Sequence, residues 1–165
     1  PTEVRLLYDD NFVYYLAISK TRIPDVMGTY VTPSLRRDFR GEANDAVTLT
    51  LDPFQDETNA FQFGVNPFGV QREGLLTNGG NVSADLDQAW DNRWFSAAKQ
   101  YRGYWVAEMA IPFKTLRFNK LLVIGMVICK HGHGLSMFMP KDQDAISIQG
   151  THALGTDHYF ESARF

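Results

Sequence analysis

Apolar and polar residues alternate along much of the chain in short stretches, and this period of two is typical of β-strands with one face in a core. Residues 4–8 and 12–18 follow the pattern on either side of the sequence Asp-Asp-Asn at 9–11, so they predict a first hairpin. Residues 47–51 alternate Val or Leu with Thr and predict a half-buried strand, which Pro53 ends. This part of the chain therefore indicates antiparallel strands joined by turns.

The pattern continues downstream. Residues 61–65 and 70–73 flank the turn-forming sequence Asn-Pro-Phe-Gly and predict a second hairpin. Further strands are expected at residues 94–98, 104–111 and 121–130. Helical periodicity is nearly absent, so we predict an all-β fold, an antiparallel β-sandwich of the jelly-roll or immunoglobulin-like kind.

Composition limits the classes of protein to consider. The chain has 165 residues, 44% of them hydrophobic and 13% aromatic, which is enough to bury the core of a single domain over residues 1–165. The net charge is −3 and no run of Lys and Arg forms a basic stripe, which argues against nucleic acid as a partner. The longest apolar run, residues 121–129, is too short to cross a bilayer. Because Pro1 leads directly into a strand pattern, we interpret the chain as a mature or trimmed piece.

A cluster of aromatic residues is the main candidate for a binding site. Its members fall within sixteen positions: Trp90, Trp94, Tyr101, Tyr104 and Trp105. Sugars stack their apolar C–H faces on aromatic rings, and their hydroxyls need directional hydrogen bonds. Residues that can supply such bonds are interleaved with the rings: Asp91, Asn92, Arg93 and Gln100. The pattern predicts a glycan-binding surface on which Trp90 and Trp94 stack, helped by Tyr104.

The same rings can instead belong to the core. Trp105 shares one strand face with Ala107, Met109 and Ile111, and such an apolar face is more often the interior of a sandwich than a cleft. We therefore expect Trp105 to be buried. A purely structural domain, in which all the aromatic residues are core, stays open as an alternative.

Acidic and amide residues suggest a metal site. Asp52, Asp56 and Asn59 surround the end of one expected strand, and Asp85 and Asp91 lie in a glycine-rich loop. Clustered oxygen ligands are what calcium requires, and calcium here would order loops rather than catalyse. The spacing matches no standard calcium loop, so turn capping by the same side chains is the alternative.

Histidines gather in the last part of the chain. His131 and His133 project to the same side of an extended segment, so they can supply two ligands to zinc or copper, with His152 or His158 as a third. No fixed spacing joins the four histidines, and a solvated loop is the alternative.

Catalysis would need positioned acids, bases or nucleophiles. Glu108 with Asp85 or Asp91 would suit glycoside hydrolysis if the carboxyl groups lay roughly 5 to 9 Å apart. A metal-dependent enzyme built on the tail histidines is a further alternative. The sequence has no Gly-x-Ser-x-Gly elbow and no glycine-rich phosphate loop between a strand and a helix, so non-catalytic binding is the main interpretation.

One stretch carries a family resemblance. The sequence WDNRWFSAAKQYRGYWVAEMAIPFKTLRF, residues 90–118, resembles the closing strands of a carbohydrate-binding module of family 9, a β-sandwich. The upstream sequences VRLLYDD, VTLTLDPF and FQFGVNPFGVQREG are similar to the same group, in particular to bacterial versions at the front of larger envelope proteins. The match covers roughly residues 2–130, whereas the tail at 131–165 does not follow the pattern.

The resemblance implies further properties. It implies glycan binding, a structural calcium ion and a periplasmic or extracellular location, and it makes Glu108 a structural residue rather than an acid catalyst. The usual first strand would lie before Pro1, so the sheet would have an open edge through which a homodimer can form, unless residues 145–149 fill it. Some sandwiches of this kind hold haem through Met with His or Lys, a lesser alternative for which the available residues are Met109, Met126, Met137, Met139, His131 and His133.

Overall fold

The structure of the 165-residue chain is a computed structural model. It describes residues 2–21, 27, 30–40, 43–53, 58–78 and 86–116. The strand expected at 121–130, the segment at 145–149 and the whole tail at 131–165 lie outside the described residues.

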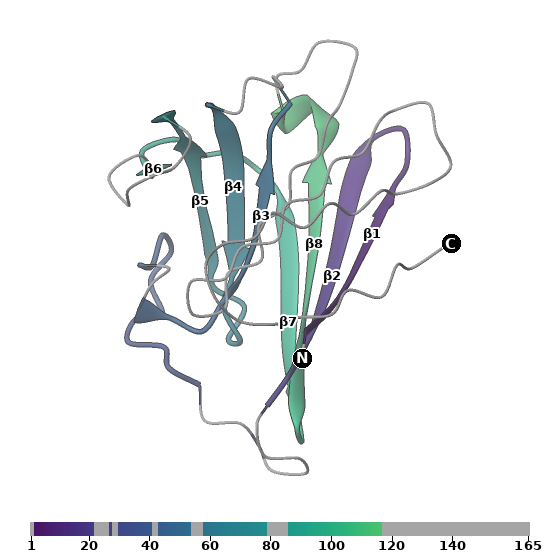
Figure 1. Ribbon diagram of the computed structural model, residues 1–165, viewed down its shortest axis with the longest axis vertical. Helices are drawn as coiled ribbons and strands as arrows, with labels where there is room; N and C mark the ends of the chain where they lie inside the picture. Colours follow the sequence, from purple (N-terminus) through teal and green to yellow (C-terminus); the bar gives the residue numbers. More distant parts are fainter. Residues whose placement is uncertain are drawn as a thin grey trace.

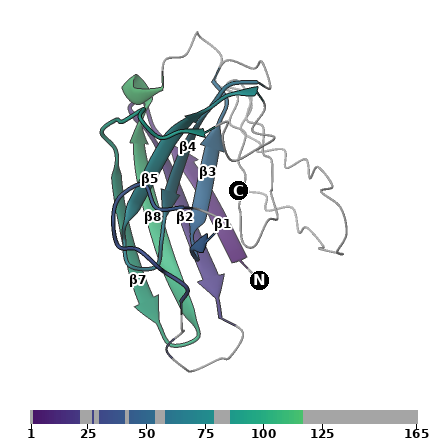
Figure 2. The ribbon, with the colours of Figure 1, turned by 90° about the vertical axis from the view of Figure 1, so that its left-hand side faces the viewer.

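The strands form two four-stranded antiparallel sheets that face each other, as the sandwich prediction required (Figures 1 and 2). The first sheet has the order β1–β2–β8–β7, with bounds Thr2–Tyr8, Phe12–Lys20, Tyr104–Pro112 and Phe95–Tyr101. The second sheet has the order β3–β4–β5–β6, with bounds Val47–Leu51, Ala60–Val65, Gln71–Leu76 and Leu86–Asp87. A short 3₁₀ helix, η4, follows β8 at Phe113–Thr115.

Both predicted hairpins are present, and side chains in their turns explain why. In the β1–β2 turn, Asp9 Oδ1 accepts the backbone N–H groups of Asn11 at 2.7 Å and Phe12 at 2.8 Å. In the β4–β5 turn, Asn66 Oδ1 accepts the N–H groups of Phe68 and Val70, both at 3.0 Å. These side chains replace backbone bonds that the turns cannot make, so Asp and Asn at these positions fix the two strand pairings.

The core lies between the sheets and follows the predicted alternation. Trp105, Ala107, Met109 and Ile111 of β8 are all buried, as expected for one inward-facing strand face. They belong to one hydrophobic cluster with Val47, Leu49, Leu51, Phe61, Phe63 and Val65 of the second sheet. Burying such a shared apolar surface is the main force that holds two sheets together.

Strand β3 differs from its prediction. Its alternation of Val or Leu with Thr indicated a half-buried strand, but all five residues are buried, with Thr48 at 5% and Thr50 at 7% exposed. The predicted half-burial is therefore wrong, because the face that carries the threonines is also covered.

In the described parts of the chain, no helix is long and apolar enough to cross a membrane.

Candidate functional site

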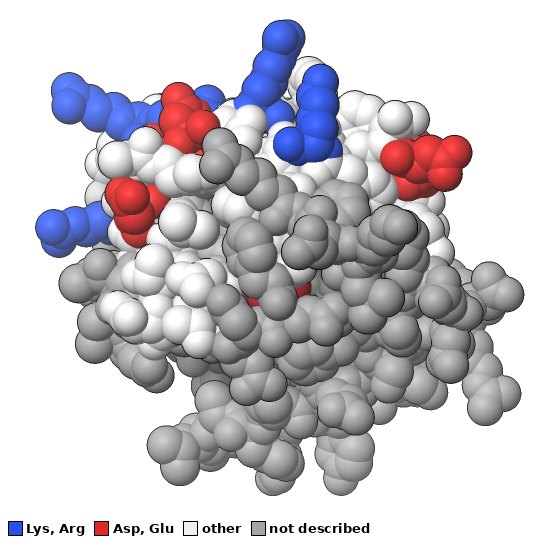
Figure 3. All heavy atoms as spheres, turned by 90° about the horizontal axis from the view of Figure 1, so that it is seen from above, with Lys and Arg blue, Asp and Glu red and all other residues white. Residues whose placement is uncertain are grey.

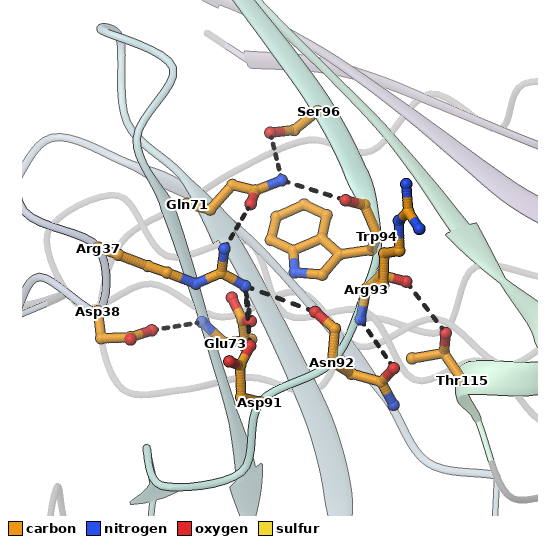
Figure 4. A network of polar contacts seen from close by, with 10 residues as sticks. All are labelled: Arg37, Asp38, Gln71, Glu73, Asp91, Asn92, Arg93, Trp94, Ser96 and Thr115. Carbon is orange, nitrogen blue, oxygen red and sulfur yellow. Dashed lines mark hydrogen bonds and ion pairs between the residues drawn. The ribbon is translucent and has the colours of Figure 1, made fainter.

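A polar network closes the side of the sandwich where β5 of the second sheet faces β7 of the first (Figure 4). Its centre is Arg37, in the segment at residues 30–40. The guanidinium donates from Nη2 to Glu73 Oε1 and to Asp91 Oδ1, the latter at 3.0 Å. Its Nη1 donates to Gln71 Oε1 at 3.1 Å, and the Asn92 carbonyl oxygen lies 3.5 Å from Nη2. One arginine therefore connects β5 to the chain that leads into β7.

Glu73 is the buried member of this network. The strand register places it opposite Phe63, on the inward face of β5, and its side chain is only 1% exposed. The Asp38 carboxylate accepts the Glu73 backbone N–H at 3.2 Å, and Asp38 adopts a left-handed conformation with φ 59°. A buried carboxylate needs a countercharge, and Arg37 supplies it from a side chain that is itself 44% exposed.

Burial changes the acidity of Glu73. Desolvation raises the pKa of this carboxyl above its ordinary value, because water no longer stabilises the charged form. The Arg37 hydrogen bond opposes that rise, Asp91 adds to it, and the nearby Trp94 indole also opposes it. Glu73 Oε2 and Trp94 Nε1 are both buried without a partner of good hydrogen-bond geometry, so the indole interacts with the carboxylate only loosely.

Gln71 and Gln100 join the two sheets along the same side. Gln71 Nε2 donates to Ser96 Oγ of β7 at 3.1 Å and lies 3.4 Å from the Trp94 carbonyl oxygen. Gln100 Nε2 donates to the Pro67 carbonyl oxygen at 3.0 Å. Gln100, expected to contact a sugar, is thus engaged in holding β7 to the β4–β5 turn.

Trp90 lies next to this network and remains partly exposed. Its ring packs on Phe61, with centroids 4.8 Å apart and planes at 36°, and meets Phe63 edge-on at 5.9 Å. The following residue, Asp91, holds a carboxylate that is 77% exposed and is paired with Arg37. We call Trp90, Asp91, Asn92 and Arg37 the Trp90 rim. It joins a partly exposed aromatic ring to a carboxylate one position further along the chain, which is paired with a guanidinium.

Trp94, also expected to stack on a sugar, lies in the core. Strand β7 begins at Phe95 rather than at Trp94, and the Trp94 ring is 4% exposed and packs edge-on against Phe63 at 5.3 Å. Protein covers both faces of this ring, so a stacking role for it does not fit the structure. Trp94 instead packs against Phe63, which also contacts the Trp90 ring.

Tyr104 lies far from the rim. It opens β8 and stacks on Tyr101, with centroids 4.8 Å apart and planes at 11°. Trp90 precedes the opposite end of β7, a strand of seven residues that spans about 20 Å at roughly 3.3 Å per residue. The structure therefore does not bring Tyr104 and Trp90 into one site.

Arg93 and Glu108 lie on the outer face of the first sheet or at its margin. Glu108 is exposed in the middle of β8, and the Arg93 guanidinium lies 6.0 Å from the centroid of the Phe95 ring. Asp91 faces Arg37 at the side of the sandwich instead. The proposed carboxylate pair of Glu108 with Asp91 thus occupies different surfaces, and Asp85 lies outside the described residues.

Most of the predicted metal ligands lie outside the residues that the structure describes. Asp56, His131 and His133 are not among the described residues, whereas Asp52 and Asn59 are and lie half-buried. Within the described ranges, no three or more His, Cys, Asp or Glu side chains are grouped closely enough to hold a metal ion. Among the described residues on the face seen in Figure 3, basic and acidic side chains are interspersed rather than gathered by sign.

Arg37, Gln71 and Glu73 were not among the site residues predicted from the sequence. A signal was present in the strand at Gln71–Leu76, where Gln71 and Glu73 share the face that Leu75 turns toward the core. A charge at an inward-facing position requires a partner of opposite charge, and the sequence Arg-Arg-Asp at 36–38 offered one.

Comparisons with known proteins bear on the fold. No protein-family model matches this chain, and no curated protein matches it at a significant level. The fold is similar to that of a solved structure from Bacteroides uniformis, described as a "putative carbohydrate-binding protein". The TM-score is 0.54 at 14% sequence identity, and the match covers 82% of this chain and 67% of the other. At this identity the likeness establishes a shared sandwich fold and does not extend to the residues of a site.

Proposed function

We propose that this protein is a non-catalytic carbohydrate-binding module that recognises a glycan at the Trp90 rim. The observation that carries the proposal is the position of Arg37, which fixes the exposed Asp91 carboxylate at 3.0 Å directly after a partly exposed tryptophan. A flat ring and oriented polar groups side by side are what a sugar requires.

The mechanism combines stacking with hydrogen bonds. The C–H face of a sugar packs on the open side of Trp90, while its hydroxyls donate to Asp91 and accept from Arg37 or from the Asn92 side chain. Phe61 and Phe63 already hold the ring, and Glu73 already holds the guanidinium. Little conformational entropy is lost on binding, and such preorganisation favours affinity.

The resemblance to family 9 modules adds two proposals. One is a structural calcium ion at Asp52, Asp56 and Asn59, of which Asp56 lies outside the described residues; a chelator would remove the ion and lower the thermal stability. The other is a periplasmic or extracellular location, which fractionation of the source cells would test. Both are supported by the family resemblance and not by contacts among the described residues.

The test is a glycan array and a pull-down on insoluble polysaccharides, with release of reducing sugar measured in the same tubes. We expect binding without product, and a loss of at least tenfold in affinity for Trp90→Ala and for Asp91→Ala. Trp90→Phe keeps a stacking surface and should retain part of the affinity. Unchanged binding by Trp90→Ala would refute the rim, and product release would show a glycoside hydrolase instead.

A further inference from the structure

The outer face of the first sheet carries a second group of aromatic side chains, away from the Trp90 rim. The register places Tyr14 of β2 opposite Ala110 of β8, and Ala110 opposite Phe95 of β7, so these three residues form one row across the sheet. Phe12 lies two positions before Tyr14 on the same strand face. Its ring centroid is 5.8 Å from that of Tyr14 and 6.3 Å from that of Phe95. Phe12, Tyr14 and Phe95 thus form a continuous aromatic platform.

The platform faces solvent although its rings are large and apolar. Phe95 is 50% exposed and Tyr14 is 37% exposed, whereas Val13 and Tyr15 on the opposite face of β2 are almost completely buried. Nothing in the folding of the sandwich requires aromatic residues on its outer side, where polar residues usually alternate with the core. A contiguous exposed apolar patch is characteristic of a binding surface.

Polar groups at the edge of the platform hold two of the rings. The Tyr14 hydroxyl donates to Asp9 Oδ2 at 2.8 Å, and this bond raises the pKa of Tyr14. At the other side, the Arg93 guanidinium lies over the Phe95 ring. The rings are therefore flanked by a fixed carboxylate and a guanidinium, each of which can hydrogen-bond a hydroxyl.

We propose that the platform of Phe12, Tyr14 and Phe95 is a second glycan-binding surface, which takes an extended polysaccharide chain rather than a single sugar. The Phe12 ring lies 5.8 Å from Tyr14 and 6.3 Å from Phe95, with planes tilted by 30° and 54°, so the three rings offer contacts to more than one sugar unit of a chain that curves across them. Asp9 and Arg93 bind hydroxyls at the margins of that chain. The inference relies on the proposed function only for the ligand class, because it uses none of the rim residues.

A protein partner fits the platform less well. Cores of protein interfaces are depleted of acidic side chains and gain their energy from desolvated pockets. Here the rings are bordered by the exposed side chain of Asp9 and by Arg93, and Leu7, opposite Tyr14, extends the apolar surface beyond them. Sugars can use both kinds of group at once, since each hydroxyl donates and accepts. The chemistry at the platform thus favours a glycan.

The test compares variants of the platform, the rim and a control. Tyr14→Ala/Phe95→Ala removes two rings of the platform, Trp90→Ala removes the rim, and Phe68→Ala is the matched control, since Phe68 is 53% exposed in the β4–β5 turn. Each protein is run by affinity electrophoresis through soluble xylan, mannan and β-glucan, and is pulled down on cellulose and chitin. Binding of the corresponding short oligosaccharides is measured by calorimetry.

The platform variant should lose at least tenfold in polysaccharide retention while keeping oligosaccharide affinity at the rim, and Phe68→Ala should behave as wild type. If the platform variant is retained like wild type and Trp90→Ala is not, the platform is wrong and the proposed function stands. If Trp90→Ala is retained and the platform variant is not, the rim is wrong and the platform stands. Failure of wild type to bind any of these glycans would overturn both.

Two further measurements keep the inference open to refutation. Chemical-shift changes in the wild-type protein on adding the retained polysaccharide should appear at the amides of residues 12, 14 and 95, and their absence there would overturn the inference even if the double variant failed to fold. Light scattering tests whether a second copy of the protein, rather than a glycan, covers the platform. A wild-type dimer that becomes monomeric in Tyr14→Ala/Phe95→Ala would make the platform a protein interface instead.

Discussion

The guanidinium of Arg37 is bound to the carboxylate of Glu73. A residue in the segment before β3 therefore supplies the positive charge that pairs with a buried carboxylate on the core-facing side of β5. The pair brings a solvent-facing side chain against one that is 1% exposed. Through Asp91, the same guanidinium reaches the chain beside Trp90. A stabilising contact and the proposed binding surface therefore depend on one residue.

Replacing Arg37 by Ala should destabilise the fold. Removing one member of a buried ion pair costs about 3–5 kcal/mol, because the other charge stays buried without a partner. Arg37 is 44% exposed and water can partly replace it, so we expect a smaller loss, about 2 kcal/mol in the free energy of unfolding. Urea denaturation followed by circular dichroism measures this difference.

A double-mutant cycle identifies the cause of that loss. If the unpaired charge of Glu73 is responsible, Arg37→Ala should cost much less in a Glu73→Gln background, where no charge is left unpaired. Equal costs in the two backgrounds would show that Arg37 stabilises the fold through Gln71 or Asp91 instead.

Glu73 should also make stability depend on pH. Desolvation raises its folded pKa above the ordinary value of 4.5, so the folded state holds the proton more tightly than the unfolded state. The stability that this group contributes is then fully present below about pH 4.5 and is lost as pH rises through the higher folded pKa. Wild type should lose stability relative to Glu73→Gln over that interval, measured as the difference in melting temperature. A difference that stays constant or grows with pH would contradict the raised pKa.

The sequence was sufficient for the strands and hairpins, for identifiable reasons. Alternation with a period of two marks strands directly, and the turn residues Asp9 and Asn66 accept the N–H groups of their own turns. Such signals are local, so no knowledge of the tertiary structure is needed. The burial of both faces of β3 was missed because alternation reports one covered face and says nothing about what covers the other.

The site was harder to predict because its contacts are not local. Arg37 and Glu73 are 36 positions apart and lie in different elements, and no periodicity joins them. Trp90 and Trp94 look equivalent in the sequence, yet only four positions separate a partly exposed ring from one that is 4% exposed. The separation of Trp90 from Tyr104 followed from strand length and was predictable, since a strand of this length keeps its two ends about 20 Å apart.

Gly74 should be intolerant of any side chain. A Cβ there would lie 2.7 Å from Leu86 Cδ1 and 2.9 Å from the Asp87 carbonyl oxygen, both in β6. Gly74→Ala should displace β6 at a cost of about 1–3 kcal/mol, as expected for overpacking. Because β6 leads into Trp90, glycan binding at the rim should weaken as well.

Gly64 supplies the control for this change. A Cβ at Gly64 would meet its nearest atom, Thr48 Oγ1, at 3.4 Å, which is ordinary contact. Gly64→Ala should therefore leave the melting temperature nearly unchanged and the rim intact. Equal losses for both glycines would indicate a general intolerance of the second sheet rather than a clash with β6.

Quenching of tryptophan fluorescence should separate the three indoles. Trp94 and Trp105 are each 4% exposed, whereas Trp90 is partly exposed, so iodide should reach Trp90 alone. Trp90→Phe should abolish the quenchable component and leave the blue-shifted emission of the other two. Trp94→Phe should keep that component, because it changes only a core ring.

A glycan bound at the rim should also protect Trp90 from iodide, because it covers the exposed side of the ring. Quenching of the glycan-bound wild-type protein should then fall to the level seen in Trp90→Phe. Persistent quenching at saturating glycan would place the ligand elsewhere, and the aromatic platform, which contains no tryptophan, would then be the surface that binds it.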